Sequence, residues 1–262
     1  MTRVAVFGAG GRMGATVCDA VLRDPELELV AAVDPHHAGL DLRTPAGQGT
    51  SGLQIHSSAD ALSEAGAEVA VDFTVHAAAR ENVEWCAANG VHAVVGTTGF
   101  TDADLDGFAA AFTSSNCLIA PNFAIGAVLM MRFAELAAPW FETAEIIELH
   151  HDQKVDAPSG TAMRTAELMA ASSNEWAPDP TKKVVADGAR GGSGPAGIRV
   201  HSVRLRGLVA HQEVLLGTEG QSLTIRHDSY DRSSFMPGVV LACKRIAEHP
   251  GLSIGLEPFL GL

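Results

Sequence analysis

The chain has 262 residues, of which 47 % are hydrophobic and 19 % are charged, so it is long enough and apolar enough to bury one large core or two modest ones. Its 18 basic and 31 acidic side chains give a formal net charge of −13. The longest basic run is Lys182-Lys183, which excludes a typical nucleic-acid binder and argues against an anionic membrane surface. We therefore expect a globular protein that binds neither nucleic acid nor a membrane.

The chain begins directly with the strand-like run 3–8, and we expect no secretory leader. The best apolar stretch, 123–131, is followed by Arg132 and is too short to cross a bilayer. Four cysteines lie far apart and form no CxxC pair: Cys18, Cys86, Cys117 and Cys243. This spacing is typical of buried, reduced thiols, so we expect a cytoplasmic protein without a metal site.

The first half of the chain alternates short apolar runs with helical patterns. Continuous Val, Ala and Ile runs that are joined by helices indicate a parallel sheet covered on both faces, as in a Rossmann-like doubly wound α/β domain. The Gly- and Pro-rich segment 35–57 is expected to be a loop. The predicted strands are 3–8, 27–34, 67–73, 91–96 and 117–122, and the predicted helices are 12–23, 76–88 and 102–113.

The pattern changes after about residue 123, which predicts a second, smaller domain of mixed α/β (α+β) class. Runs that alternate apolar and polar residues are typical of a mostly antiparallel sheet with one covered face. Segment 174–197 is rich in Gly and Pro and predicts a loop. The predicted helices are 126–138, 160–172 and 235–251, and the predicted strands are 144–151, 198–207, 208–218 and 222–229.

Glycines at positions 8, 10, 11 and 14 lie between the first predicted strand and its helix. Exposed backbone N–H groups at a helix N-terminus can hold a pyrophosphate, although a tight strand-to-helix turn also favours glycine. Met13 stands where the strict G-x-G-x-x-G fingerprint has its third glycine. The glycines predicted to lie against the phosphates are Gly8, Gly10, Gly11 and Gly14.

Asp34 ends the second predicted strand, about 20 residues after Gly14, where a carboxylate can bind the ribose diol of a dinucleotide. The alternative is that Asp34 only begins an ordinary loop before Pro35. Asp34 would repel a 2′-phosphate whereas Arg12 could attract one, so the choice between NADH and NADPH stays open.

Two further stretches follow predicted parallel strands and are expected to line the nicotinamide end of the crevice. The alternative is plain turn and N-cap chemistry, with Thr101 as a helix start. The residues are Gly96, Thr97 and Thr98 in one stretch, and Ala120, Pro121, Asn122 and Phe123 in the other.

The stretch "ELHHDQKVDAPSGTA", residues 148–162, joins a predicted strand to a predicted helix. Strand geometry turns His150 and His151 to opposite faces, and Lys154 follows where the chain can fold back. A histidine titrates near neutral pH and can transfer a proton, and a lysine adds positive charge or a second proton. The Pro-Ser-Gly-Thr run predicts a helix N-terminus that can receive a carboxylate. A capped helix after a polar loop explains Ser159 and Thr161, but not the two histidines and Lys154.

The motifs "GAGGRMG", "VVGTTG", "APNFAIGA" and "ELHHDQKVDAPSGTA", in this order and spacing, resemble the dihydrodipicolinate reductase (4-hydroxy-tetrahydrodipicolinate reductase) family of lysine and diaminopimelate biosynthesis. The resemblance covers essentially the whole chain, including 207–239. It implies that residues 1–122 and 232–262 form the dinucleotide-binding domain. Residues 123–231 would form the substrate-binding and oligomerisation domain of a homotetramer.

The resemblance also implies roles for individual residues. Ala9, Arg12 and Met13 would contact the dinucleotide, together with the glycines of the turn. His150 would donate or accept a proton, Lys154 would be a second proton donor, and the substrate would be held by His151, Gly160 and Thr161. Some members of the family carry an arginine directly after the ribose-binding acid, which favours NADPH. Here that position is Pro35, which weakens an assignment to NADPH.

The implied reaction is hydride transfer from NADH or NADPH to a cyclic imine dicarboxylate, with loss of water from the 4-hydroxy precursor. One alternative is another two-domain NAD(P) oxidoreductase, in which we would not expect the His-His-x-x-Lys and Ser-Gly-Thr combination. The other is a redox-sensing NAD(H)-binding protein, which has no need of an acid–base pair.

Overall fold

The computed structural model describes residues 1–43 and 52–262, and these form two compact units. The first unit comprises Met1–Ile125 and Arg232–Leu262, and the second comprises Gly126–Asp231. The chain thus returns to its first unit after completing the second.

The first unit is built on a seven-stranded sheet in the order β12-β6-β5-β4-β1-β2-β3, and every pair of neighbouring strands is parallel. Five of the strands contain a continuous apolar run of three or more residues, as such a doubly covered sheet requires. The strands are β1 (Thr2–Phe7), β2 (Leu27–Val33), β3 (Ile55–His56), β4 (Val69–Asp72), β5 (His92–Val95), β6 (Cys117–Ile119) and β12 (Leu252–Ile254).

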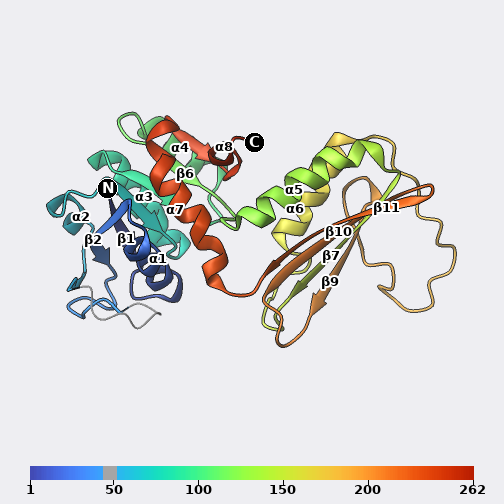
Figure 1. The fold of residues 1–262 in the computed structure, drawn as a ribbon, viewed down its shortest axis with the longest axis horizontal. Coiled ribbons are helices and arrows are strands. Elements are labelled where there is room, and N and C mark those ends of the chain that lie inside the picture. The colour runs from blue at the N-terminus through green and yellow to red at the C-terminus, as the bar shows by residue number, and fades with distance from the viewer. Residues whose placement is uncertain (44–51) are drawn as a thin grey trace. The chain divides into compact units, whose positions relative to one another are not determined.

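Helices cover this sheet on both faces, as Figure 1 shows. Three of the helices coincide closely with the predicted ones, and Thr101 caps α4 through a capping box with Asp104. The helices are α1 (Arg12–Arg23), α2 (Asp60–Glu64), α3 (His76–Asn89), α4 (Asp102–Ala111), α7 (Met236–Arg245) and α8 (Glu257–Leu260). The Rossmann-like fold class is confirmed.

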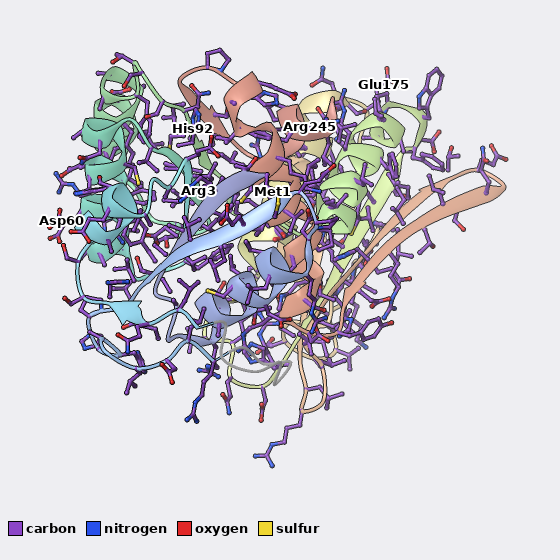
Figure 2. All side chains as sticks on the ribbon, turned by 60° about the vertical axis from the view of Figure 1, so that its left-hand side comes forward. Met1, Arg3, Asp60, His92, Glu175 and Arg245 are labelled. Atoms are coloured by element: carbon purple, nitrogen blue, oxygen red, sulfur yellow. The ribbon has the colours of Figure 1, made fainter. Side chains whose placement is uncertain are left out.

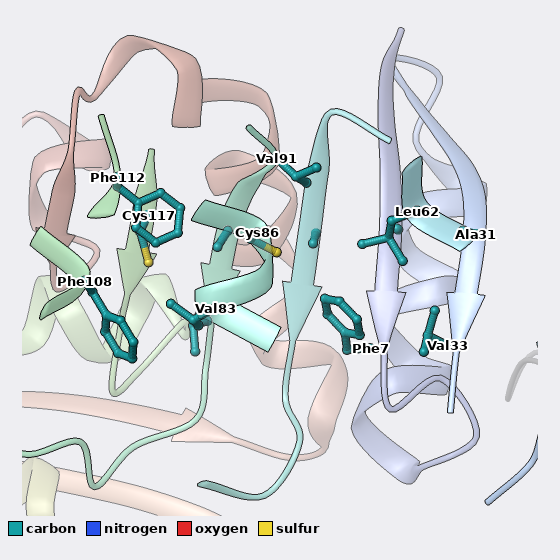
Figure 3. Close-up of a cluster of buried hydrophobic side chains, with 14 of the residues drawn as sticks. Phe7, Ala31, Val33, Leu62, Val83, Cys86, Val91, Phe108, Phe112 and Cys117 are labelled. Carbon is teal, nitrogen blue, oxygen red and sulfur yellow. The ribbon is translucent and has the colours of Figure 1, made fainter. Parts of the chain in front are cut away.

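One face of the sheet forms a hydrophobic core with α2, α3 and α4 (Figure 3). Leu62 from α2 is fully buried there, and Val83 and Cys86 project from α3 against Phe108 of α4. The four cysteines of the chain are all buried and free, as predicted. Burial raises the pKa of the Cys18 thiol and of the Cys243 thiol to about 12, so neither is a thiolate near neutral pH.

The predicted loop over 35–57 is partly wrong, because Ile55–His56 forms the short strand β3 beside β2. Residues 44–51 of that predicted loop lie outside the described residues. Strand β12 was not predicted at all. Asn116 fixes it in place, since its side chain donates to the carbonyl of Ile246 (2.8 Å) and accepts from the N–H of Gly251 (3.1 Å).

Two residues labelled in Figure 2, Arg3 and His92, lie on interior strands of this sheet and bind neighbouring segments through hydrogen bonds. Arg3 on β1 donates from Nε to the carbonyl of Gly66 (3.0 Å), and its N–H donates to Glu68 (2.8 Å). His92 on β5 accepts from the N–H of Asn116 through Nδ1 (2.9 Å). Burial lowers the pKa of His92, so this imidazole stays neutral and keeps the acceptor.

The second unit is a five-stranded mixed sheet in the order β11-β10-β7-β9-β8. Strand β7 is antiparallel to β10 and parallel to β9, and the other two pairs are antiparallel. The predicted loop over 174–197 contains one short strand, β8. The strands are β7 (Thr143–His150), β8 (Gly192–Ser193), β9 (Arg199–Arg204), β10 (Ala210–Thr218) and β11 (Gln221–Ser229).

Helices α5 (Ile125–Ala137) and α6 (Gly160–Ser172) lie on one face of this sheet (Figure 1). Ile146 and Val214, which pair across β7 and β10, are fully buried. Their alternating neighbours Ile147 and Leu215 are only half-buried. The pattern is that of a sheet with one covered and one open face, as the alternation in the sequence predicted.

Candidate active site

The carboxyl ends of the parallel strands bring most of the predicted dinucleotide-binding residues to one edge of the first unit. Strands β2 and β3 lie on one side of β1, and β4, β5 and β6 lie on its other side. The direction in which successive strands are added therefore reverses between β1 and β4. Ligands of doubly wound sheets bind outside the carboxyl ends at such a switch point. The glycine turn, Asp34, Gly96 and Ala120 each directly follow one of these strands.

The glycine turn leaves its free N–H groups at the start of α1. Gly8 has φ +67°, and a Cβ on Gly14 would lie 2.0 Å from the Gly8 carbonyl oxygen, so both positions require glycine. Gly14 therefore takes the close-packing role that the strict fingerprint gives to the position of Met13. The N–H groups of Ala9, Gly10 and Gly11 donate to the carbonyl of Val33, to the Asp34 side chain and to the carbonyl of Gly8, respectively. The N–H groups of Arg12 and Met13 have no acceptor among the described residues.

Asp34 is buried and links the glycine turn to the loop after β2. Its Oδ2 accepts from the N–H of Gly10 (3.1 Å), and its Oδ1 accepts from the N–H of His36 (3.0 Å). The Nδ1 atom of His37 lies 3.1 Å from Oδ2. Beside them is a hollow of about 660 Å³, lined among others by His37 and Arg43.

The other two predicted stretches are held together by a segment that sequence reasoning missed, Asp72-Phe73-Thr74. Asp72 is buried, and its side chain accepts from the N–H and the hydroxyl of Thr74 (both 2.7 Å). Thr97 donates to the Thr74 carbonyl (2.7 Å). The ring of Phe73 packs against Phe123 at 5.5 Å and closely against Gly96. In the sequence, this segment could have been recognised from the run Asp-Phe-Thr at the end of a predicted strand of the same sheet.

In the second unit, His150 ends β7 and contacts a buried carboxylate. Its Nδ1 lies 2.5 Å from Oε2 of Glu148, whose side chain has no exposed surface. Arg204 on the neighbouring strand β9 donates to both oxygens of Glu148 at 2.8 Å. The Nε2 atom of His150 has no hydrogen-bond partner in residues 1–43 or 52–262. His151 lies beyond the strand and is exposed, with its carbonyl accepting from the N–H of Lys154.

Lys154 is mostly buried and pairs with Asp156, which is exposed. Its Nζ donates to both carboxylate oxygens, at 2.8 and 2.9 Å. These hydrogen bonds lower the pKa of Asp156, so its carboxyl group is ionised at neutral pH. The loop that carries Lys154 is tied to β9, since Arg204 also donates to the Asp156 carbonyl at 2.6 Å.

The N-terminus of α6 has two satisfied and two free N–H groups. Ser159 is the N-cap; its N–H donates to Oε1 of Glu148 (3.2 Å), and its hydroxyl accepts from the N–H of Ala162 (3.2 Å). Ser159 is therefore buried as the cap of α6. The N–H groups of Gly160 and Thr161 have no partner in the described part of the chain, and helix termini favour anions at such groups.

The charges around His150 act on its pKa in opposite directions. Burial lowers the pKa, the hydrogen bond and the charge of Glu148 raise it, and the charges of Lys154 and Arg204 lower it again. The pKa of His150 is lowered as a result. Burial raises the pKa of Glu148, but hydrogen bonds from Arg204 and other neighbours outweigh it and leave that pKa lowered. Glu148 is consequently an anion throughout the neutral range.

Glu148 and Arg204 were missed by sequence reasoning. Glu148 lies two residues before His150, and strand periodicity alone places both side chains on one face. Arg204 is 56 residues away, and only the pairing of β7 with β9 brings it to Glu148. Glu148 could therefore have been recognised from the sequence, whereas Arg204 could not.

Two family models match the chain. One is described as "Dihydrodipicolinate reductase, N-terminus" and matches residues 2–123, and the other is described as "Dihydrodipicolinate reductase, C-terminus" and matches residues 126–260. A protein of Nocardia farcinica named "4-hydroxy-tetrahydrodipicolinate reductase" is 52 % identical over 267 residues, with 99 % of each chain covered. A protein of Streptomyces coelicolor with the same name is 51 % identical, with 99 % of this chain and 98 % of that one covered.

Solved structures agree with these matches. A dipicolinate-bound dihydrodipicolinate reductase from a Paenisporosarcina species is 43 % identical, with a TM-score of 0.87 and coverage of 98 % of this chain and 99 % of that chain. An amine dehydrogenase from Mycobacterium smegmatis has a TM-score of 0.67 at 15 % identity and shares the fold alone. Both halves of the chain are thus accounted for by one family, and the chain belongs to the dihydrodipicolinate reductases.

Proposed function

We propose that this enzyme reduces 4-hydroxy-tetrahydrodipicolinate to tetrahydrodipicolinate, with loss of water and oxidation of NADH or NADPH, in lysine and diaminopimelate biosynthesis. Membership of the family supports the reaction. The observation that carries it in this chain is that one buried carboxylate, Glu148, contacts both the imidazole of His150 and the N–H of Ser159, the N-cap of α6. An acid–base group and an anion receptor are thereby held side by side.

The first unit fits a pyridine nucleotide. The free N–H groups of Arg12 and Met13 at the start of α1 suit a pyrophosphate, and Gly8 and Gly14 allow the close turn. We assign the adenosine ribose to Asp34 and the nicotinamide end to 96–98 and 120–123. When bound, the nucleotide supplies a hydride from its nicotinamide ring.

We infer that both NADH and NADPH are accepted. Asp34 can bind a ribose diol, and the hollow beside it is also lined by His37 and Arg43, whose side chains can donate to a 2′-phosphate.

The second unit fits a dicarboxylate. The N–H groups of Gly160 and Thr161 offer two donors in the geometry that the two oxygens of one carboxylate require. Lys154 supplies a positive charge, and His151 is exposed nearby in sequence. We assign substrate binding to these residues, and a second proton-donor role to Lys154.

His150 handles the proton that the reaction consumes. Reduction of a conjugated imine at carbon leaves an enamine, which must be protonated. A histidine whose Nε2 is free and whose Nδ1 is bound to a carboxylate can deliver that proton from a fixed position. Because burial lowers the pKa of His150, its imidazolium gives up the proton readily near neutral pH.

We also propose a homotetramer, assembled through the open face of the five-stranded sheet. Ile147, Leu149 and Leu215 on that face are only half-buried within one chain. Partner subunits would cover these apolar side chains. Light scattering after size exclusion should give four times the mass of the 27.3 kDa chain.

A cytoplasmic location is inferred from the cysteines, which are all buried and unpaired. None of the helices in the described ranges is long and apolar enough to cross a bilayer.

The proposed reaction is tested by the loss of nicotinamide absorbance, with substrate generated from pyruvate and aspartate semialdehyde. His150→Ala should lose about 10²–10⁴-fold in kcat, the usual contribution of a positioned acid, while NADH binding by fluorescence titration is unchanged. His56→Ala, which removes an exposed histidine, is the matched control. Wild-type turnover in His150→Ala would remove His150 from the mechanism, and no turnover in the native enzyme would refute the proposed function.

A further inference from the structure

Glu148 is a charged residue in a place where a charge is costly. Its side chain has no exposed surface and is surrounded by hydrogen-bond donors, namely His150, Arg204, the Ser202 side chain and the N–H of Ser159. Burying an ion pair seldom increases stability over an apolar pair of the same volume, because desolvation offsets the attraction. A buried, charged Glu148 beside the imidazole of His150 is therefore better explained by function than by stability.

The Glu148–Arg204 pair connects all the parts of the candidate site in the second unit. Through Oε2 it reaches His150 at the end of β7, and through Oε1 it reaches the N-cap Ser159 of α6. Arg204 reaches the Asp156 carbonyl in the loop that carries Lys154. One buried ion pair thus fixes the proton donor, the anion receptor and the second cation relative to one another.

The contact between Glu148 and His150 also selects the imidazole tautomer. An ionised carboxylate can only accept a hydrogen bond, so Nδ1 of His150 must carry a proton in both protonation states. In neutral His150 this leaves Nε2 without a proton, and in the imidazolium Nε2 carries the proton that can leave. Nε2 is also the ring nitrogen that has no hydrogen-bond partner within the described ranges.

We propose that Glu148 is a positioning residue that keeps the Nδ1 proton of His150 in place, so that Nε2 exchanges the proton with the substrate, and that Arg204 keeps Glu148 ionised. This inference rests on the proposed function, because it assumes that His150 is the proton donor. Glu148 touches neither substrate nor cofactor in this assignment and acts only through His150 and Ser159.

Strand β7 offers a matched control on its opposite face. Glu145 lies three residues before Glu148 and likewise pairs with an arginine and a histidine, Arg190 (2.5 Å) and His201 (2.7 Å). The two carboxylates belong to the same strand and have the same kinds of partner. Only Glu148 is joined to His150, so a general loss of ion-pair stabilisation and a specific loss of positioning can be told apart.

The test compares Glu148→Gln with Glu145→Gln in the full-length enzyme, by kcat over a range of pH and by thermal unfolding. Glu148→Gln should lower kcat by about 10²-fold or more, as expected when a general acid loses its orientation, whereas Glu145→Gln should stay within about threefold of the native enzyme. The charges that face His150 are Glu148, Lys154 and Arg204. Removing the only anion among them should shift the alkaline fall of kcat to lower pH.

Equal kcat values in Glu148→Gln and native enzyme would overturn the proposal, as would equal losses in both variants. If Glu148→Gln does not fold, ¹⁵N NMR of the native imidazoles decides, with the His150 signals identified by their absence in His150→Gln. Neutral His150 should show a protonated Nδ1 and a bare Nε2, and the reverse tautomer would refute the inference. This readout does not depend on turnover, so it stays valid even if the proposed reaction were wrong.

Discussion

Gly160→Pro is a substitution that should weaken substrate binding without lowering the stability of the folded enzyme. Gly160 is the first residue of α6, where proline is tolerated because its missing N–H has no partner within the helix. The preceding Ser159 has φ −66° and ψ 150°, the extended conformation that a residue before proline requires. A Cβ on Gly160 meets nothing within 4 Å.

The expected magnitude follows from the hydrogen bond that is lost. A hydrogen bond to a charged group contributes about 1.5–3 kcal/mol, so one donor fewer for the carboxylate should raise KM for the substrate by roughly 10–150-fold. Stability should be unchanged or higher by about 0.4–1 kcal/mol, because proline restricts the unfolded chain.

Steady-state kinetics and thermal unfolding measure both expectations on the same samples. Gly160→Ala keeps the N–H and is the matched control, with a KM close to that of the native enzyme. The KM for NADH should be unaffected in both variants. If Gly160→Pro folds with unaltered Tm and binds substrate as tightly as the native enzyme, the N–H of Gly160 is not a substrate ligand.

Three other expectations follow from the described contacts. Asp34→Ala should shift the ratio of kcat/KM from NADH toward NADPH by about tenfold, as for a lost hydrogen bond to a charged group, and an unchanged ratio would exclude a contact with the ribose. Thr101→Ala removes the half of the capping box on α4 in which the Thr101 hydroxyl accepts from the N–H of Asp104, and it should cost about 1 kcal/mol in urea unfolding with unaltered kcat; no loss of stability would contradict the role of the cap. Burial raises the pKa values of Glu145 and Glu148, but the hydrogen bonds and charges of their partners lower them by more. Both pKa values are therefore below the value of 4.5 in the unfolded chain. Their stabilisation should be complete above about pH 4.5 and lost as the pH falls through the folded-state pKa values, so a urea midpoint that stays constant down to pH 3 would contradict it.

The local patterns in the sequence were sufficient for most of the elements of both sheets. Helix α1 was predicted residue for residue, because its apolar spacing and the glycine turn before it are both local. Strand β12 was missed because Leu252–Ile254 is short and only partly buried, and it is fixed by Asn116, more than 130 residues earlier in the chain. Strand β3 is two residues long and follows a segment rich in glycine and proline.

The same distinction holds for the candidate site. His150, Lys154 and Gly160 lie within eleven residues of one another, so a single stretch of sequence revealed them. Glu148 lies two residues before His150 in a predicted strand, and Asp72 lies near the end of another, so the strand pattern could have revealed both. Arg204 could not be predicted, since nothing local indicates that β9 lies beside β7.

Because β7 is a central strand, the activity of this enzyme depends on the number of residues in β7 as well as on their identity. Because β7 is locked between β10 and β9, deletion of one residue between Thr143 and Glu148 would shift the strand register and turn every following side chain to the opposite face. Leu149 would then point toward α6, and His150 would point toward the open side of the sheet. Single-residue insertions or deletions in this strand are therefore expected to abolish turnover even where the shifted strand remains paired.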